Sequence, residues 1–248
     1  MNSKFIDTHI HLDLVKDYEE IIRDIEKNEM YIISMTNLPA LFEKNIEMIK
    51  SKKIRIALGF HPELIYQYKN QIPLMWKLLD KTKYIGEVGL DLKNRTIDEK
   101  DYQIKFFNEL IEKCNYKKEK VISVHSRGSE SEIISILNKN IKSKIILHWY
   151  SGNLTNLNLA INLGCYFSIN TSMINTKKGQ EIIKKIPNER LLTESDFPFI
   201  KSKKKLYCIE EIPEIVQNLS QIKKMTKDEM KNQIFRNFKE LLREQTIT

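Results

Sequence analysis

The sequence predicts an α/β protein, one (β/α)8 TIM barrel with an extra C-terminal helix, and three observations support this prediction. Eight short apolar runs alternate with longer segments in which apolar residues recur at helical spacing. Strands that alternate with helices are typical of a parallel sheet with crossover helices, and eight such units close into a barrel. The length of 248 residues suits one barrel, and no Pro/Gly/Ser-rich linker divides the chain. We therefore expect residues 1–248 to form one domain.

Each predicted strand is rich in β-branched, aromatic or other apolar residues and is bounded by polar or turn-forming residues. In chain order these runs are Phe5–Leu12, Tyr31–Thr36, Ile54–Phe60, Tyr84–Leu90, Val121–His125, Ile145–Trp149, Cys165–Ile169 and Arg190–Glu194. Apolar residues three or four apart indicate helices between them, for example at Tyr18–Ile25, Ile104–Ile111 and Ile133–Leu137. Lys227–Arg243 carries the last apolar stripe and is the predicted C-terminal helix. An open doubly wound sheet is the alternative, but no G-x-G-x-x-G motif follows the first run.

The chain is basic, with 41 Lys and Arg against 33 Asp and Glu and a net charge of +8. This charge favours a polyanionic partner, although an abundance of Lys, Ile and Asn can raise it without a functional reason. Cys114, Cys165 and Cys208 are scattered and have no CxxC spacing. With no signal peptide and no apolar run of about 20 residues, we expect reduced thiols, a cytoplasmic location and no membrane partner.

Two histidines stand close together in the first predicted strand. On a strand, residues i and i+2 point to the same side, so His9 and His11 are expected to project together. Two imidazoles that converge in this way are good ligands for a borderline metal ion. Two polar residues satisfied by backbone or water at a strand end are the alternative, and the rest of the chain decides between these readings.

Other ligand-type side chains end or follow the predicted strands. The full set is His9, His11, His61, Glu87, Asp91, His125, His148, Glu194 and Asp196. In a (β/α)8 barrel the active site forms where the carboxyl ends of the strands meet. A lone histidine at a strand end is usually structural, but all five histidines of the chain on one rim, together with carboxylates, predict a metal centre.

The segments that carry these residues resemble a known family. FIDTHIHLD, GFHPE, GEVGLD, VHSRGS, HWYSG, YFSIN and LLTESDFPF are similar to the successive motifs of the TatD-type deoxyribonucleases of the amidohydrolase superfamily. The resemblance covers nearly the whole chain, in order and at matching spacing. Within the family, HWYSG and the compact chain most resemble the TatD-like nucleases of Qat anti-phage defence systems.

The resemblance implies a site with two divalent metal ions, which Zn, Mn or Mg would suit. It assigns His9, His11 and Asp196 to one ion, His125 and His148 to the second, and Glu87 to a bridge between them. Two cations about 3.5–4 Å apart activate water and stabilise the leaving oxygen of a phosphodiester. Glu87 and Asp196 are the expected catalytic carboxylates, with Asp196 taking a proton from the attacking water.

The sequence departs from the usual family pattern at three places. Ser195 stands where Thr is usual, Trp149-Tyr150 where a Cys-Phe or similar pair is common, and Asn170-Thr171 where a Gly often follows the seventh strand. None of these changes removes a ligand, so they concern substrate preference and not metal binding.

Further residues are candidate substrate contacts. We expect His61 to hold a phosphate or donate a proton to the leaving group, Arg127 to grip a phosphate, and Trp149 to stack on a base. Asp91 lies among them and is expected to orient a metal-binding histidine. The lysine run follows the last strand, where a polyanion would enter, and consists of Lys201, Lys203, Lys204 and Lys205. Core packing for Trp149 and a solvated loop for the lysines are the alternatives.

The expected activity is metal-dependent hydrolysis of phosphodiester bonds in DNA. Action on single strands or 3′ ends, from 3′ to 5′, is what the resemblance implies, with DNA and other proteins of a Qat-type system as partners. Two alternatives stay open: an amidohydrolase or deacylase acting on a different small or nucleotide-linked substrate, and a barrel that acts mainly as a docking module in a defence complex. Binding that weakens steeply with salt would favour the polyanion.

Overall fold

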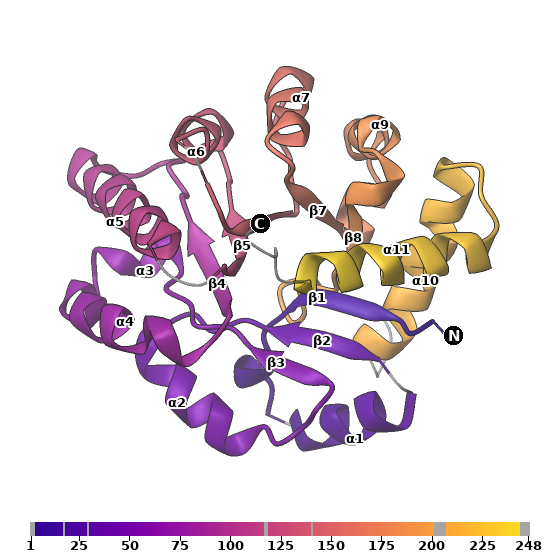
Figure 1. Ribbon diagram of the computed structural model, residues 1–248, viewed down its shortest axis with the longest axis horizontal. Coiled ribbons are helices and arrows are strands. Elements are labelled where there is room, and N and C mark those ends of the chain that lie inside the picture. Colours follow the sequence, from indigo (N-terminus) through magenta and orange to yellow (C-terminus); the bar gives the residue numbers. More distant parts are fainter. Residues whose placement is uncertain are drawn as a thin grey trace.

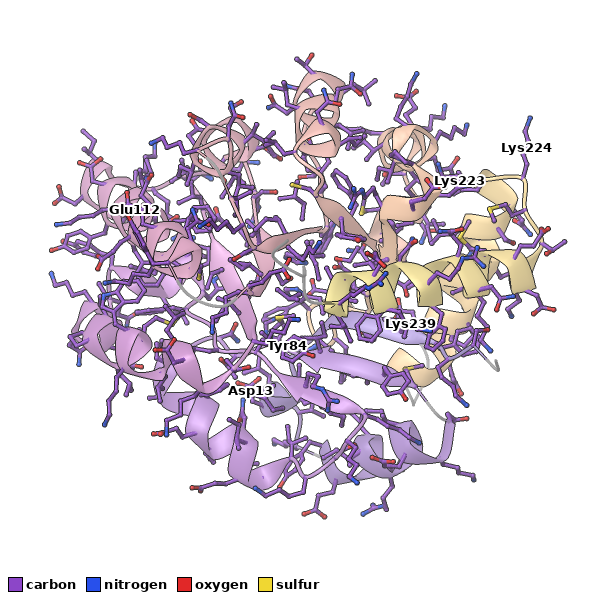
Figure 2. The ribbon with its side chains drawn as sticks, in the orientation of Figure 1. Asp13, Tyr84, Glu112, Lys223, Lys224 and Lys239 are labelled. Atoms are coloured by element: carbon purple, nitrogen blue, oxygen red, sulfur yellow. The ribbon has the colours of Figure 1, made fainter. Side chains whose placement is uncertain are left out.

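The computed structural model describes residues 3–16, 18–28, 30–116, 119–139, 141–200 and 207–243. In this part of the chain, strands form a central ring and helices surround it (Figure 1). Charged side chains at the periphery, such as Lys224 in the turn between the last two helices, point away from the ring (Figure 2). The lysine run at 201–205 lies outside the described residues. No described helix is long and apolar enough to cross a membrane.

All eight predicted strands are present, and every pair of hydrogen-bonded neighbours is parallel. Their bounds are β1 Ile6–Ile10, β2 Tyr31–Ser34, β3 Ile54–Ile56, β4 Tyr84–Gly89, β5 Val121–His125, β6 Lys144–His148, β7 Tyr166–Ile169 and β8 Leu191–Thr193. They pair in sequence order as β1-β2-β3 and β4-β5-β6-β7-β8. This order is the one expected when each strand is followed by a crossover helix.

Two sets of backbone contacts join these sheets into a closed barrel. A parallel bridge between Leu58 and Ile85 connects the chain after β3 to β4. The Asp196 amide donates to the His9 carbonyl oxygen at 2.9 Å and connects the chain after β8 to β1. The predicted (β/α)8 barrel is therefore confirmed, and the open sheet is wrong.

Helices cover the outside of the barrel and bury apolar faces against it. Their bounds are α1 Tyr18–Asn28, α2 Pro39–Met48, α3 Pro62–Ile65, α4 Ile72–Leu78, α5 Ile97–Asn115, α6 Glu130–Leu137, α7 Leu154–Asn162, α8 Thr171–Ile174, α9 Lys177–Lys185, α10 Tyr207–Ile222 and α11 Lys227–Leu242. The longest, α5, begins with a capping box between Thr96 and Glu99 and turns Phe106, Phe107 and Leu110 inward. A spacing of three and four residues puts these three side chains on one helix face.

The predicted C-terminal helix is α11, which follows α10 and packs against the start of β8. The side-chain amide of Asn237 donates to the carbonyl oxygens of Asn188 and Leu191, both at 2.7 Å. Met230, Ile234 and Phe238 lie on the inner face of this helix and are buried. The helix therefore covers the end of the barrel opposite to the strand ends that carry the histidines.

Six of the eight strands are shorter than the sequence predicts, and β1 and β3 shorten most. β1 ends at Ile10, and its pairing with β2 shifts register between Asp7 and Ile10, so His11 lies just beyond the strand. β3 ends at Ile56, and His61 follows it after a short irregular segment as the N-cap of α3. Both histidines still lie at the carboxyl end of the barrel.

Candidate metal centre

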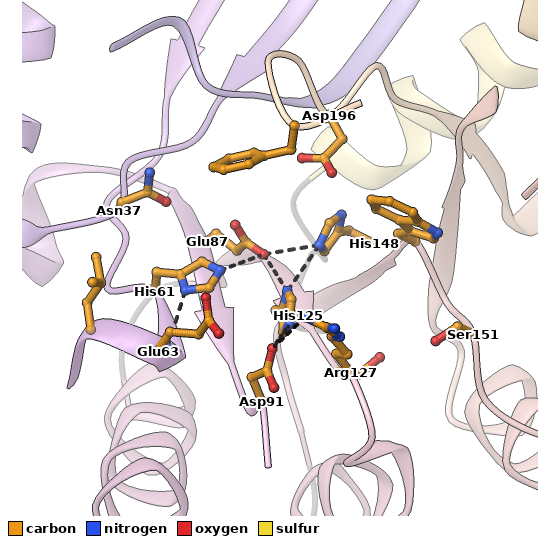
Figure 3. A pocket seen from close by; sticks show the side chains of 14 residues that line it. Asn37, His61, Glu63, Glu87, Asp91, His125, Arg127, His148, Ser151 and Asp196 are labelled. Carbon is orange, nitrogen blue, oxygen red and sulfur yellow. Dashed lines mark hydrogen bonds and ion pairs between the residues drawn. The ribbon is translucent and has the colours of Figure 1, made fainter. Parts of the chain in front are cut away.

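The six predicted metal ligands converge at the carboxyl end of the barrel. They are His9 on β1, His11 just after it, Glu87 on β4, His125 and His148 as the last residues of β5 and β6, and Asp196 in the loop after β8. All are buried except His125, which is partly buried. Figure 3 shows Glu87, His125, His148 and Asp196 facing one pocket.

Glu87 lies between two groups of imidazoles. Its Oε2 is 3.3 Å from His11 Nε2 and 3.6 Å from His9 Nε2. Its Oε1 is 2.7 Å from His125 Nδ1 and 3.1 Å from His148 Nε2. Each carboxylate oxygen therefore faces its own pair of ring nitrogens, as in a carboxylate that bridges two ions.

Asp196 completes the first group. Its Oδ1 lies 3.8 Å from His11 Nε2 and 3.9 Å from His9 Nε2. One ligand atom from each of these three residues lies within 4.8 Å of the other two. The two Nε2 atoms are 3.3 Å apart, so both rings turn the same nitrogen toward one point.

Three candidate ligands, His9, His125 and His148, direct their second ring nitrogen toward another buried side chain. His9 Nδ1 is 2.8 Å from the Ser123 hydroxyl, and His125 Nε2 is 3.1 Å from Asp91 Oδ2. A partner on the outer nitrogen fixes the tautomer and the orientation of a ligating imidazole. The expectation that Asp91 orients a histidine agrees with this contact, and Asp91 itself is almost fully buried.

Glu194 is the outer partner of His148, and the sequence had not given it a role. Its Oε1 lies 3.4 Å from His148 Nδ1. The same oxygen accepts hydrogen bonds from the Trp149 amide at 3.1 Å and from Asn170 Nδ2 at 2.8 Å, while Oε2 accepts one from Ser168 Oγ. Its signal in the sequence was its place at the end of the eighth predicted strand, two residues before Asp196.

The electrostatics of the pocket are those of a crowded set of carboxylates. Burial raises the pKa of Asp196 to about 8; His148 opposes this rise, and Glu194 and Glu87 add to it. Burial also favours the neutral form of Glu87, but His61 and His148 outweigh it and hold its pKa well below the usual range. The carboxylates therefore give the centre a negative charge, which protonated histidines or bound cations would balance.

The histidines respond to these charges in different ways. Burial lowers the pKa of His9 well below its usual value, with His148 adding to the effect, so its ring is neutral and can donate a lone pair. Burial opposes protonation of His148, but Glu194 and Glu87 raise its pKa well above the usual value. A cation bound at Glu87 Oε1 would replace that ring proton, since metal binding to imidazole releases protons. Converging imidazole nitrogens and carboxylate oxygens fit divalent ions such as Zn and Mn.

His61 contacts the same carboxylate through a nitrogen that carries a hydrogen. Its Nδ1 accepts a hydrogen bond from the Glu63 amide at 3.3 Å, so the proton of the neutral ring is on Nε2. That Nε2 lies 3.5 Å from Glu87 Oε1. In this arrangement His61 offers a donor, which agrees with its predicted role toward the substrate.

A pocket of about 700 Å³ opens over these groups. Arg127 and Trp149, for which substrate contacts are predicted, line it together with Phe199, which the sequence pattern did not single out. Arg127 Nη1 lies 3.8 Å from Asp91 Oδ2, and 63% of its side chain is exposed. Lys201, Lys203, Lys204 and Lys205 lie outside the described residues, so their predicted phosphate contacts stay a prediction.

Comparison with known proteins points to one family. The sequence model of the family described as TatD related DNase matches residues 6–243. An uncharacterised metal-dependent hydrolase of Methanocaldococcus jannaschii is 26% identical over 94% of this chain and 95% of its own. Human Deoxyribonuclease TATDN3 is 24% identical over 81% and 80%. The crystal structure of a TatD family hydrolase from Entamoeba histolytica superposes with a TM-score of 0.80 at 21% identity, over 97% of this chain and 98% of that one. The chain thus belongs to the family of TatD related DNases.

Proposed function

We propose that this TatD-type hydrolase is a metal-dependent DNase that cleaves phosphodiester bonds in single-stranded DNA and shortens strands from the 3′ end. The observation that carries the proposal is the division of Glu87 between two groups of imidazole nitrogens. A site for two adjacent cations suits a phosphodiester, which has a non-bridging anionic oxygen and a poor leaving group. The name of the human relative, a deoxyribonuclease, supports DNA as the substrate.

The proposed ligand sets follow the two oxygens of Glu87. His9, His11 and Asp196 would hold one ion on the Oε2 side of Glu87, and His125 and His148 would hold the other on the Oε1 side. Bound there, Zn, Mn or Mg would lower the pKa of water, neutralise the phosphate and stabilise the leaving oxygen. Ser123, Asp91 and Glu194 keep the imidazoles turned inward.

Asp196 and His61 assist the two proton transfers. A cation bound beside Asp196, which lies at the rim of the pocket, would favour its carboxylate form, and that carboxylate would accept a proton from the attacking water as the water oxygen bonds to phosphorus. As the bond from phosphorus to the leaving oxygen breaks, His61 Nε2–H donates a hydrogen bond to that oxygen, and a solvent water supplies the proton that the oxygen takes up.

Positive side chains provide the contacts that hold the strand. The exposed guanidinium of Arg127 is the nearest described phosphate ligand. Lys201, Lys203, Lys204 and Lys205 follow Asp196 by at most nine residues and extend this contact along the strand. Contacts of this kind bind the backbone without reading the sequence of the bases.

The test uses single strands labelled at either end, each incubated with the protein and a panel of Zn, Mn and Mg. A strand with a 5′ label should shorten progressively, a strand with a 3′ label should release its label first, and a chelator should abolish both. Products cut internally from the start would make the enzyme an endonuclease. No cleavage with any ion, together with turnover of an amide or ester substrate, would replace DNase activity by the deacylase alternative.

We also propose that the chain is a QatD-like protein and acts as the nuclease component of a Qat anti-phage system. The HWYSG segment and its Trp149 support this narrower assignment. Phage should then form as many plaques on a strain whose complete defence system carries Glu87→Ala as on a strain without the system. The wild-type system should reduce the number of plaques. Equal protection by both versions would leave the barrel as a docking module.

A further inference from the structure

We infer that Trp149 and Phe199 form a pair of base-binding platforms, one on each side of the dinuclear centre, which take the two nucleobases that flank the scissile phosphate. The inference rests on the proposed function and names a subsite that the metal centre alone does not define. Its ligand is an unstacked base, because a stacked base in a duplex has no free face to offer an aromatic ring.

Trp149 is an exposed aromatic residue whose backbone position is fixed. It follows the proposed ligand His148 directly, 36% of its surface is exposed, and it lines the pocket. Its φ of 41° is uncommon for a bulky residue, and the Glu194 carboxylate holds it there through the amide hydrogen bond of 3.1 Å. The same carboxylate lies beside His148, so the platform and the ligand share one support.

Phe199 occupies a similar place beside the other group of ligands. It is 57% exposed, lines the same pocket and lies three residues after Asp196. Its amide donates to the Asp196 carbonyl oxygen at 2.9 Å. Its ring centroid is 5.0 Å from that of His11, at an interplanar angle of 90°. The ring is therefore held against a ligand of the first proposed ion while much of its surface meets solvent.

The two aromatic rings thus accompany different ions. Trp149 belongs to the His148 side of Glu87, and Phe199 to the His11 side. A phosphodiester that meets both ions through its phosphate extends one nucleoside toward each side. Each base then reaches one aromatic residue, and stacking needs no base-specific hydrogen bond because every base has a π face.

Core packing, the alternative role for Trp149 and Phe199, explains their exposure less well. A rim tryptophan that served the core would pack its ring against core side chains, as the partly buried Trp76 does by stacking on the buried Phe106 with centroids 5.1 Å apart. Large exposed apolar side chains inside one concave site, next to charged groups, are typical of ligand recognition.

The test removes either the ring or the base. Oligothymidylate is compared with strands in which an abasic residue replaces the terminal or the penultimate nucleotide, and kcat/KM is measured for wild type, Trp149→Ala and Phe199→Ala. Each base removed should lower the wild-type value on the order of tenfold. On the intact strand, kcat/KM of each variant should fall by about the same factor. The kcat/KM of each variant should not fall further when one of the two bases is removed, and that base should differ between Trp149→Ala and Phe199→Ala. Tyr116→Ala, which removes a 92% exposed ring at the end of α5, should behave as wild type.

Further measurements keep the outcome clear. Trp149→Phe retains a ring and should recover most of the loss, and bound metal should equal that of wild type in all variants. In a Trp76→Phe background, Trp149 is the only tryptophan, and oligothymidylate should quench its emission while the fully abasic strand does not. Equal abasic penalties in wild type and both variants, or absent quenching, would overturn the inference. Absence of cleavage by the wild type would instead contradict the proposed DNase activity, and the quenching experiment would still test the base contact.

Discussion

At the scale of single residues, Glu87 and His61 touch the same centre in different ways. Glu87 faces both groups of imidazoles, whereas His61 approaches only Oε1 and does so through a protonated nitrogen. We therefore predict that Glu87→Ala loses most of its bound metal and its turnover, while His61→Ala keeps the metal and loses turnover on the order of 10²-fold. Metal content by mass spectrometry and kcat on a labelled strand give both quantities.

The His9→Ala/His11→Ala variant is the matched reference for loss of one ligand group. It should keep its fold, because both side chains lie at the rim and not among the apolar residues of the core, and it should lose metal. Wild-type metal content in this variant, or metal loss in His61→Ala, would refute the proposed division of roles.

Glu194 carries a separate prediction, because its carboxylate supports His148 and three hydrogen-bond donors. Glu194→Gln keeps the size of the side chain but replaces one acceptor oxygen by an NH2 group, which cannot accept the hydrogen bonds of the neighbouring donors. The affinity for metal should therefore fall about 10–100-fold. Competition with a chelator of known affinity measures the change. Glu181→Gln, on the exposed side of α9, should leave the affinity unchanged. Equal affinity of the two variants would show that Glu194 does not position the ligand.

The sequence predicted the residues of the centre better than their neighbours. Parallel strands bring their carboxyl ends together, so ligand-type side chains at those ends had to converge. Glu194 had this signal but no predictable role, and Ser123 and Phe199 lacked the signal, because a hydroxyl or a ring near a strand end has many structural uses. The donor nitrogen of His61 depends on the Glu63 amide, and only the geometry of α3 reveals that contact.

At the scale of elements, the contact between β1 and β8, here called the seam, positions His9 and His11 at the end of β1 and Asp196 after β8. Asp7 on β1 accepts hydrogen bonds from the Ser195 amide at 3.1 Å, the Ser195 hydroxyl at 2.6 Å and the His9 amide at 3.1 Å. All three residues are fully buried. Without this carboxylate, three buried donors would lose their acceptor.

Asp7→Ala should therefore lower the free energy of unfolding by about 2–4 kcal/mol, since each unsatisfied buried donor costs about 1–3 kcal/mol. Asp7→Asn retains one acceptor oxygen for the two amides and should lose much less. Denaturant unfolding of the metal-free proteins measures both. Equal losses in the two variants would mean that packing, and not the hydrogen bonds, stabilises the seam.

The order and type of the elements were predictable, but most strand ends were not. The run Val121–His125, which is apolar on one face and carries Ser123 and His125 on the other, matches β5 residue for residue. The predicted ends of β1 and β3 were too late because apolar residues continue after pairing stops. Gly89 illustrates what a pattern cannot predict: a Cβ there would lie 2.1 Å from the His125 carbonyl oxygen, so glycine allows β4 and β5 to approach beside the centre.

At the scale of the whole molecule, the net charge of +8 carries a prediction about binding. Replacing Lys201, Lys203, Lys204 and Lys205 with Ser should weaken binding of single strands, because lysines that neutralise phosphates release counterions. The slope of log K against log salt should become shallower by roughly 0.7 for each phosphate that is no longer neutralised. Affinity at several salt concentrations measures it, and turnover of a small phosphodiester, too short to reach the run, should stay at the wild-type level. An unchanged slope would mean that the run is a solvated loop.

The seam also determines when, during synthesis, the centre becomes complete. His9 and His11 leave the ribosome early, but the Ser195 partner of Asp7 lies 188 residues further along the chain. N-terminal segments usually begin to fold while translation continues. Here the first-made strand has no neighbour on one side until the last-made strand emerges, and Asp196 follows that strand. A nascent chain therefore carries two of its imidazoles without the carboxylate that completes their group, and the proposed nuclease stays inactive until the last strand and Asp196 have left the ribosome.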